Sequence, residues 1–147
     1  MNAVAVSHQH QMRVDVLDTV ARLAGFTENL HGRLPDGRMP DVLRTALPSR
    51  SVFLGDAKAT ETPWDPGTRR RLARYMSWMR RNCLAWGPGG VFALCVGPEV
   101  DALYWALLIE ELTRATGLEA TAARCRALDP STVVVWVYPV ADRPSSR

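Results

Sequence analysis

The chain contains almost no lysine. Of the 18 basic residues among its 147, Lys58 is the one lysine and the other 17 are arginine. A strong preference for arginine and alanine is what a GC-rich genome produces, so the bias by itself does not point to a function. The lysine that remains inside the segment Gly55-Asp56-Ala57-Lys58 is therefore more informative than the bias.

Cysteine is also scarce, and long apolar runs are absent. The three cysteines, Cys83, Cys95 and Cys125, are odd in number and none belongs to a Cys-x-x-Cys pair. This pattern argues against a disulfide framework or a zinc knuckle and indicates a reducing compartment. No run approaches the ~18 apolar residues of a membrane span, and the first residues lack the basic and apolar regions of a secretory signal. We therefore expect a cytoplasmic protein that makes no contact with a membrane.

The composition is that of one folded domain. Hydrophobic residues make up 47% of the chain and charged residues 22%, which excludes a disordered or fibrous protein. A net charge of +3 permits an anionic partner such as nucleic acid without requiring one. The run Gly87-Pro-Gly-Gly90 leads into a strand rather than a helix, so it is no P-loop. We expect a single domain over residues 3–140 and a disordered tail over 141–147.

Hydrophobic periodicity predicts an α/β fold. The turn sequence Pro35-Asp36-Gly37 indicates a hairpin, and the range 118–128 is ambiguous. Helices separated by apolar strands predict a sheet with helices on both faces. Helical spacing is found over 7–24, 68–82 and 99–116, and strand patterns over 30–34, 38–45, 51–58, 91–96 and 132–138.

One group of charged residues falls where chemistry is expected. Side chains alternate along a strand, so Asp56 and Lys58 lie on one face, beyond Leu54. An acid and an amine at the end of a buried strand are costly unless they pair or bind something. Antiparallel pairing of the predicted strands 38–45 and 51–58 would bring Asp41 beside Asp56. Two carboxylates and a lysine together form a site for Mg²⁺ or Mn²⁺.

These residues carry a resemblance to a known superfamily. Pro40-Asp41 followed after fourteen residues by Asp56-Ala57-Lys58 resembles the signature of the PD-(D/E)XK nucleases. The resemblance implies the restriction-endonuclease-like fold, a mixed central sheet flanked by helices with an αβββαβ core. It also implies that Asp41 and Asp56 are metal ligands, that the Ala57 backbone carbonyl is a third ligand, and that Lys58 is the catalytic lysine.

Many members of that superfamily add an acid from the first helix or from the segment before the hairpin. Glu28, in the connection after the first helix, is the candidate here. Of the two Pro-Asp pairs, Pro35-Asp36 is turn-like, whereas Pro40-Asp41 is strand-like, and we therefore assign the ligand to Asp41.

The resemblance implies a Mg²⁺-dependent DNA endonuclease that acts as a homodimer. The helix with six arginines could follow phosphates, with Arg70 and Arg74 as the first candidates, or present a solvated basic face. The apolar segment Leu103–Leu112 could cover the sheet or form the dimer interface.

Several other residues have two readings. Glu61 could reach a metal ion through water or be a plain loop acid, and His31 could be a proton shuttle. His8 and His10 are expected to be capping or exposed residues near a helix start. Trp64 and Trp86 could stack on bases, although packing is the simpler expectation.

Three alternatives to a free-standing nuclease stay open. Asp56 and Lys58 could form a structural ion pair in an unrelated sheet. The chain could be a non-catalytic nucleic-acid-binding or assembly module that keeps the fold. It could also be a subunit of a larger complex that is active only with a protein partner.

Overall fold

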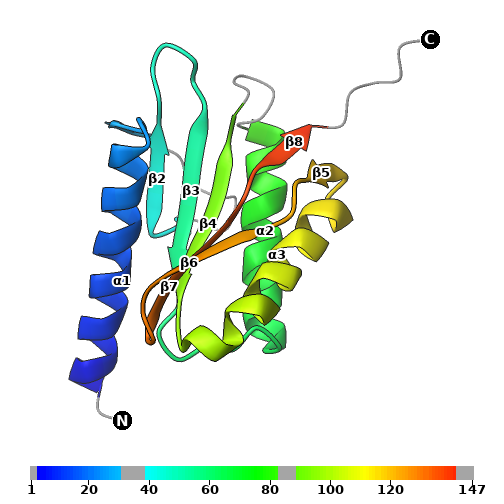
Figure 1. The fold of residues 1–147 in the computed structure, drawn as a ribbon. Coiled ribbons are helices and arrows are strands. Elements are labelled where there is room, and N and C mark those ends of the chain that lie inside the picture. Colours follow the sequence, from blue (N-terminus) through cyan, green and yellow to red (C-terminus); the bar gives the residue numbers. More distant parts are fainter. Residues whose placement is uncertain (1–2, 31–38, 83–88, 142–147) are drawn as a thin grey trace.

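The computed structural model of the chain describes residues 3–30, 39–82 and 89–141 (Figure 1). Three helices and a short 3-10 turn lie in these ranges: α1 (Ala3–Leu23), α2 (Pro66–Asn82), η1 (Glu99–Asp101) and α3 (Ala102–Ala115). The strands of the same ranges are β1 (Glu28–Asn29), β2 (Val42–Thr45), β3 (Val52–Ala57), β4 (Val91–Val96), β5 (Leu118–Ala120), β6 (Arg124–Asp129), β7 (Thr132–Val137) and β8 (Pro139–Ala141).

The described strands form one mixed sheet and one small ribbon. Six strands follow the order β1-β2-β3-β4-β7-β6, and β5 pairs with β8 separately. Strands β1, β2 and β3 form an antiparallel meander, and β3 then pairs with β4 in parallel. A parallel neighbour needs a crossover connection, which here contains α2. The predicted α/β class with helices around a mixed sheet is confirmed.

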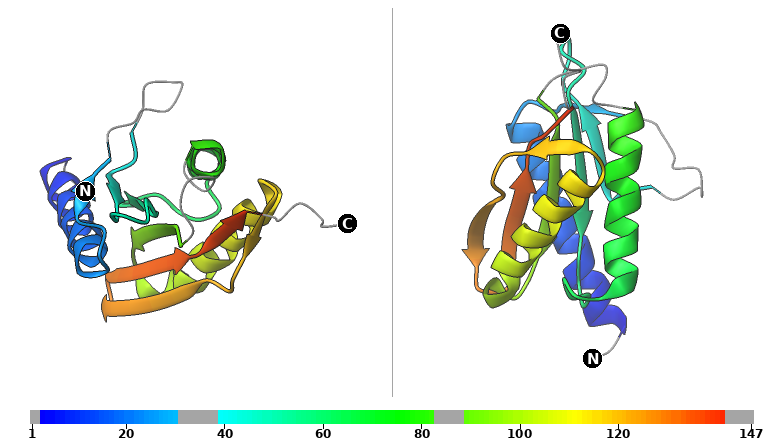
Figure 2. Two further views of the ribbon diagram at one scale, coloured as in Figure 1. Left: turned by 90° about the horizontal axis from the view of Figure 1, so that it is seen from above. Right: turned by 90° about the vertical axis from the view of Figure 1, so that its right-hand side faces the viewer.

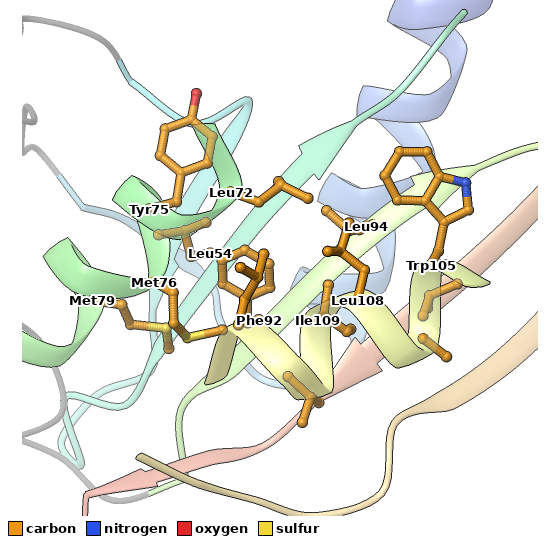
Figure 3. Close-up of a cluster of buried hydrophobic side chains, with 14 of the residues drawn as sticks. Leu54, Leu72, Tyr75, Met76, Met79, Phe92, Leu94, Trp105, Leu108 and Ile109 are labelled. Carbon is orange, nitrogen blue, oxygen red and sulfur yellow. The ribbon is translucent and has the colours of Figure 1, made fainter. Parts of the chain in front are cut away.

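Helices cover both faces of the sheet, as the sequence predicts. Helix α1 lies on one face, and α2 and α3 lie on the other (Figures 1 and 2). Strand β3 shows the alternation directly, since Leu54 packs with α2 and α3 whereas Phe53 packs with Leu17 of α1. The core on the α2 and α3 side is drawn in Figure 3, where Met76 and Ile109 lie close to Phe92 of β4.

The helix predicted over 68–82 is confirmed as α2, and its apolar side chains at helical spacing face the core. Leu72, Met76 and Met79 are fully buried. Thr68, the first residue of the predicted helix, is not its capping residue. The cap is Asp65, whose carboxylate accepts hydrogen bonds from the Gly67 amide and the Thr68 hydroxyl. The helix starts earlier than predicted because proline is well suited to the first helical position, which Pro66 occupies.

The structure differs from the sequence prediction at three other places. The first strand of the hairpin lies at Glu28–Asn29, before the predicted range 30–34, and residues 31–38 are outside the described ranges. The ambiguous range 118–128 contains β5 and most of β6, and β6 pairs with β7. Ala141, expected in the tail, ends β8.

None of the described helices is long and apolar enough to cross a membrane.

Candidate active site

Two of the cavities in the described structure differ in character. One of ≈ 450 Å³ lies between α1 and strands β6 and β7, and among its lining residues Arg126 alone is charged. The other, of ≈ 340 Å³, opens at the carboxyl end of β3. It gathers three acids, two bases and a histidine: Asp41, Asp56, Glu61, Lys58, Arg71 and His10. The smaller cavity is therefore the one with the groups for chemistry.

The floor of this cavity is a buried ion pair. Asp56 lies on the same face of β3 as Leu54, so its side chain points to the α2 side of the sheet. Lys58 follows two residues later, and its Nζ lies 2.5 Å from Asp56 Oδ2. The two side chains are 6% and 2% exposed, so the single lysine of the chain is almost entirely removed from water. Burial of both charges has to be offset by close pairing, which this geometry supplies.

Strand pairing places Asp41 next to this pair, as the hairpin prediction requires. Val42 of β2 lies opposite Gly55 of β3, and the same register continued by one residue sets Asp41 opposite Asp56. The Ala57 amide donates to Asp41 Oδ2 at 2.8 Å, which fixes the carboxylate against β3. Asp41 therefore precedes β2 rather than lying within it, but it still reaches the predicted position.

The two carboxyl groups interact directly. Burial raises the pKa of Asp56 to about 7, a shift to which the neighbouring Asp41 carboxyl contributes and which the Lys58 ammonium opposes. Two acids side by side need a proton or a cation between them. The Lys58 ammonium supplies one such positive charge beside Asp56.

Helix α1 contributes a residue that the sequence did not assign to the site. His10 Nε2 lies 3.3 Å from Asp41 Oδ2, and the histidine side chain is 40% exposed. The expected capping role of His10 is wrong, because α1 begins at Ala3 and His10 lies two turns inside it. The expected exposure is partial, since the side chain also contacts Asp41. His8 does not line the cavity.

Helix α2 closes the opposite wall with Arg71 and Tyr75, one turn apart on the same face. Tyr75 is 4% exposed and its hydroxyl donates to the Met39 carbonyl at 3.4 Å. Figure 3 shows the Tyr75 hydroxyl directed away from the apolar cluster beneath the ring. Within the described ranges, the Arg71 guanidinium forms no ion pair or hydrogen bond. It is a half-buried cation facing two carboxylates across a cavity.

The arginines named as nucleic-acid contacts lie elsewhere on α2. Arg70 and Arg74 are exposed and do not line the cavity. Arg69, also on α2, forms an ion pair with Glu111 of α3. The division of roles follows helical phase, because Arg71 is the arginine that shares a face with Tyr75.

The predicted accessory acid Glu28 is not brought to the site. It pairs with Thr45 at the far end of β2, whereas Asp41 precedes the near end. Glu61 does line the cavity, and its carboxylate accepts a hydrogen bond from the Ala59 amide at 2.9 Å. His31, Cys83, Trp86 and the turn at Asp36 lie outside the described residues.

The donor set fits a hard divalent cation. In the described ranges no three His, Cys, Asp or Glu side chains are arranged to hold a metal by themselves. Mg²⁺ does not require that, because it keeps several waters and is usually bound through one or two carboxylates plus substrate phosphate. Asp41 and Asp56 supply the carboxylates. The Ala57 carbonyl points to the same side as its amide, toward Asp41, since both groups of a strand residue face one neighbour.

Comparisons with known proteins give the chain no relative: no family model, no curated protein and no solved structure matches it.

Proposed function

We propose that the chain is a cytoplasmic, divalent-metal-dependent endonuclease that hydrolyses phosphodiester bonds in DNA. One observation carries the proposal. Asp41, Asp56 and the single lysine of the chain meet in one cavity at the end of a buried strand. Residues with perturbed pKa values and close charged partners are concentrated at functional sites.

The topology supports the restriction-endonuclease-like assignment. From α1 to β4 the elements follow the order helix, three strands, helix, strand. The three strands form an antiparallel meander, and the fourth pairs in parallel with the third through α2. This is the αβββαβ order that the motif resemblance implies, and it puts the Pro-Asp and Asp-x-Lys segments on neighbouring strands.

In the proposed site, Asp41, Asp56 and the Ala57 carbonyl hold Mg²⁺ or Mn²⁺. When bound, the cation supplies charge to a phosphate oxygen and lowers the pKa of a water. Lys58 keeps its ammonium within 2.5 Å of Asp56, so a phosphate or water oxygen seated beside Asp56 is within its reach. The lysine orients that water or stabilises charge that develops on the phosphate. Hydrolysis then releases a 3′-hydroxyl and a 5′-phosphate, the polarity that the resemblance implies.

Two other groups of the cavity suit a phosphodiester. Arg71 adds a cation on the opposite wall, and a guanidinium binds phosphate oxygens with well-defined geometry. The exposed Arg70 and Arg74 extend this positive charge along α2, where the backbone of a longer DNA would pass. His10 is close enough to Asp41 to hold that carboxylate in place.

The alternative function is a non-catalytic nucleic-acid-binding or assembly module that is active only with a protein partner. The basic face of α2 would serve it equally well. Such a module does not need a paired Asp41 and Asp56, and DNA binding by it would not depend on a divalent ion. The metal dependence of the chain therefore separates the two functions.

The test is nicking of supercoiled plasmid and of a branched DNA, with Mg²⁺ or Mn²⁺ against EDTA. Cleavage is expected only when Mg²⁺ or Mn²⁺ is present. It should be lost in Asp41→Asn, Asp56→Asn and Lys58→Ala. Asp15→Asn, which removes an exposed acid of α1 away from the cavity, is the matched control and should cleave normally. Absence of cleavage on every substrate, with DNA binding equal in all variants, would refute a stand-alone enzyme.

A homodimer is part of the proposal, because two strands require two sites. The α3 ridge, defined as Trp64, Val100, Leu103, Tyr104 and Leu107, is between 52% and 80% exposed. The four residues of η1 and α3 repeat at helical spacing, and Trp64 packs edge-on against Tyr104. If a second copy covers this ridge, roughly 1,200 Å² is buried in total, the lower end of stable interfaces.

Sedimentation of the purified chain tests the ridge as an interface. The wild type should sediment as a dimer, and Leu103→Glu with Leu107→Glu should make it monomeric. Leu128→Glu alters an equally exposed leucine on β6, outside the ridge, and should leave the dimer intact. A monomeric wild type, or a dimer that the ridge variant does not change, contradicts this part of the proposal.

A further inference from the structure

Beneath the candidate site lies a buried arginine that the sequence did not single out. Arg13 is on α1, three residues after His10, and is 1% exposed. Its Nη1 donates to the carbonyl oxygens of Lys58 and of Ala59, the latter at 3.1 Å. Its Nη2 donates to the Ser131 carbonyl at 2.7 Å. One guanidinium thus joins α1, the segment after β3, and the turn between β6 and β7.

Stability alone does not account for this arginine. In the described ranges no carboxylate forms an ion pair with it, and its Nε has no hydrogen-bond partner. Burial lowers the pKa of Arg13, which reflects the cost of its charge in this place. A buried cation bonded to carbonyls is more expensive than an apolar side chain of similar size. The residue is therefore best explained by what its hydrogen bonds hold.

Those hydrogen bonds define the backbone of the lysine. The Lys58 amide donates to the Cys95 carbonyl of β4 at 2.9 Å, and the Lys58 carbonyl accepts from Arg13. With both peptide groups fixed, the direction in which the Lys58 side chain leaves the backbone is fixed as well. The side chain then reaches Asp56 although β3 has already ended at Ala57.

We infer that Arg13 is a positioning residue: its guanidinium holds the carbonyls of Lys58 and Ala59, and so keeps the Lys58 ammonium beside Asp56. The geometric part of this inference is independent of the nuclease proposal. Its consequence for cleavage rests on that proposal.

The neighbouring glycine is consistent with this role and supplies a second variant. A β-carbon on Gly97 would lie 2.6 Å from Arg13 Nη2 and would also collide with the Ser131 carbonyl. Both contacts are too close, so Gly97→Ala has to displace the guanidinium or the turn. The variant therefore disturbs the same hydrogen bonds while Arg13 itself is kept.

The single lysine allows a direct measurement. Protein grown with ¹³C- and ¹⁵N-labelled lysine gives side-chain NMR signals from Lys58 alone. In Arg13→Met and in Gly97→Ala these signals should move toward those of free lysine. Arg44→Met is the matched control, because Arg44 also joins α1 to the sheet, through Asp18, but lies outside the cavity. Its Lys58 signals should stay at the wild-type position.

Near-native tryptophan indole signals establish that each variant is folded. Unmoved Lys58 signals in a folded Arg13→Met would overturn the inference, and if that variant does not fold, Gly97→Ala decides in the same way. In the cleavage assay Arg13→Met should lower kcat at least tenfold with KM unchanged, and Arg13→Lys should restore part of the loss. If the wild type cleaves no DNA but the Lys58 signals still move in Arg13→Met, the nuclease proposal is refuted and the positioning role stands.

Discussion

The buried Asp56–Lys58 pair can be tested as a pair. The variants are Asp56→Leu, Lys58→Met and the double replacement. Both side chains are at most 6% exposed, so removal of one partner leaves the other charge uncompensated in the interior. Each single change should therefore cost about 3–5 kcal/mol of unfolding free energy. Replacement of both by apolar residues of similar size should be neutral or should stabilise the fold by about 1–4 kcal/mol.

The measurement is urea denaturation in EDTA at pH 8. That pH lies above the pKa of about 7 of Asp56, so the carboxylate is ionised in the wild type. The control is the same double-mutant cycle on Arg69 and Glu111, whose side chains are 45% and 56% exposed. Their coupling should be far smaller because solvent screens an exposed pair.

The decisive quantity is the stability of the double variant. A neutral or stabilised double variant means that the pair is retained at a cost to the fold, as expected of a functional site. A double variant less stable than the wild type by about 2 kcal/mol or more would refute this reasoning. It would instead favour the structural ion pair in an unrelated sheet.

Three further predictions concern the same cavity. The pKa of Asp56 in the folded protein is raised to about 7, so between about pH 4 and pH 7 the folded protein keeps a proton that the unfolded chain has released. The unfolding free energy in EDTA should therefore fall as the pH rises from about 4 to 7. This pH dependence should be weaker in Asp56→Asn. His10→Ala should weaken Mg²⁺ binding, measured by calorimetry, about tenfold or more, because an orienting partner of Asp41 is lost; unchanged affinity would contradict that role. Arg71→Met should reduce plasmid nicking more than Arg70→Met does, since the first residue lines the cavity and the second does not; equal losses would contradict the assignment.

The site itself could be predicted from the sequence to a large extent. Period-2 alternation along β3 places Asp56 and Lys58 on the face of Leu54, and the structure bears this out. Antiparallel pairing of two consecutive strands was enough to predict that Asp41 lies near Asp56, and the observed register sets the two opposite each other. Both steps are local, and local patterns are what a single sequence records best.

Contacts made across the fold could not be read in the same way. Arg13 lies on the buried stripe of α1, which continues backward from Ala21 and Leu17 at helical spacing, and His10 follows one turn further on, where the helix is partly exposed. Hydrophobicity alone places Val14 on this stripe, and Val14 does pack there, but it does not indicate Arg13, because an arginine is rarely buried. What stabilises Arg13 in the interior is a set of carbonyls from residues 45 to 118 positions away, and no periodicity encodes them.

The retention of lysine at position 58 is the last feature that the structure explains. In a chain with 17 arginines, Lys58→Arg keeps the charge and follows the composition, so a purely electrostatic role would tolerate it. The ammonium, however, sits 2.5 Å from Asp56 with 2% of the side chain exposed, and a planar guanidinium is larger and has a different hydrogen-bond geometry. We expect Lys58→Arg to cost about 1–3 kcal/mol of stability through overpacking. We also expect it to lower metal-dependent nicking by at least about 100-fold, because the displaced donor no longer reaches the reacting oxygen. Arg124→Lys, a charge-preserving exchange at an exposed arginine of β6 outside the cavity, is the control and should retain full activity. Full nicking by Lys58→Arg would mean that charge alone suffices, and that the single lysine carries no information about the chemistry.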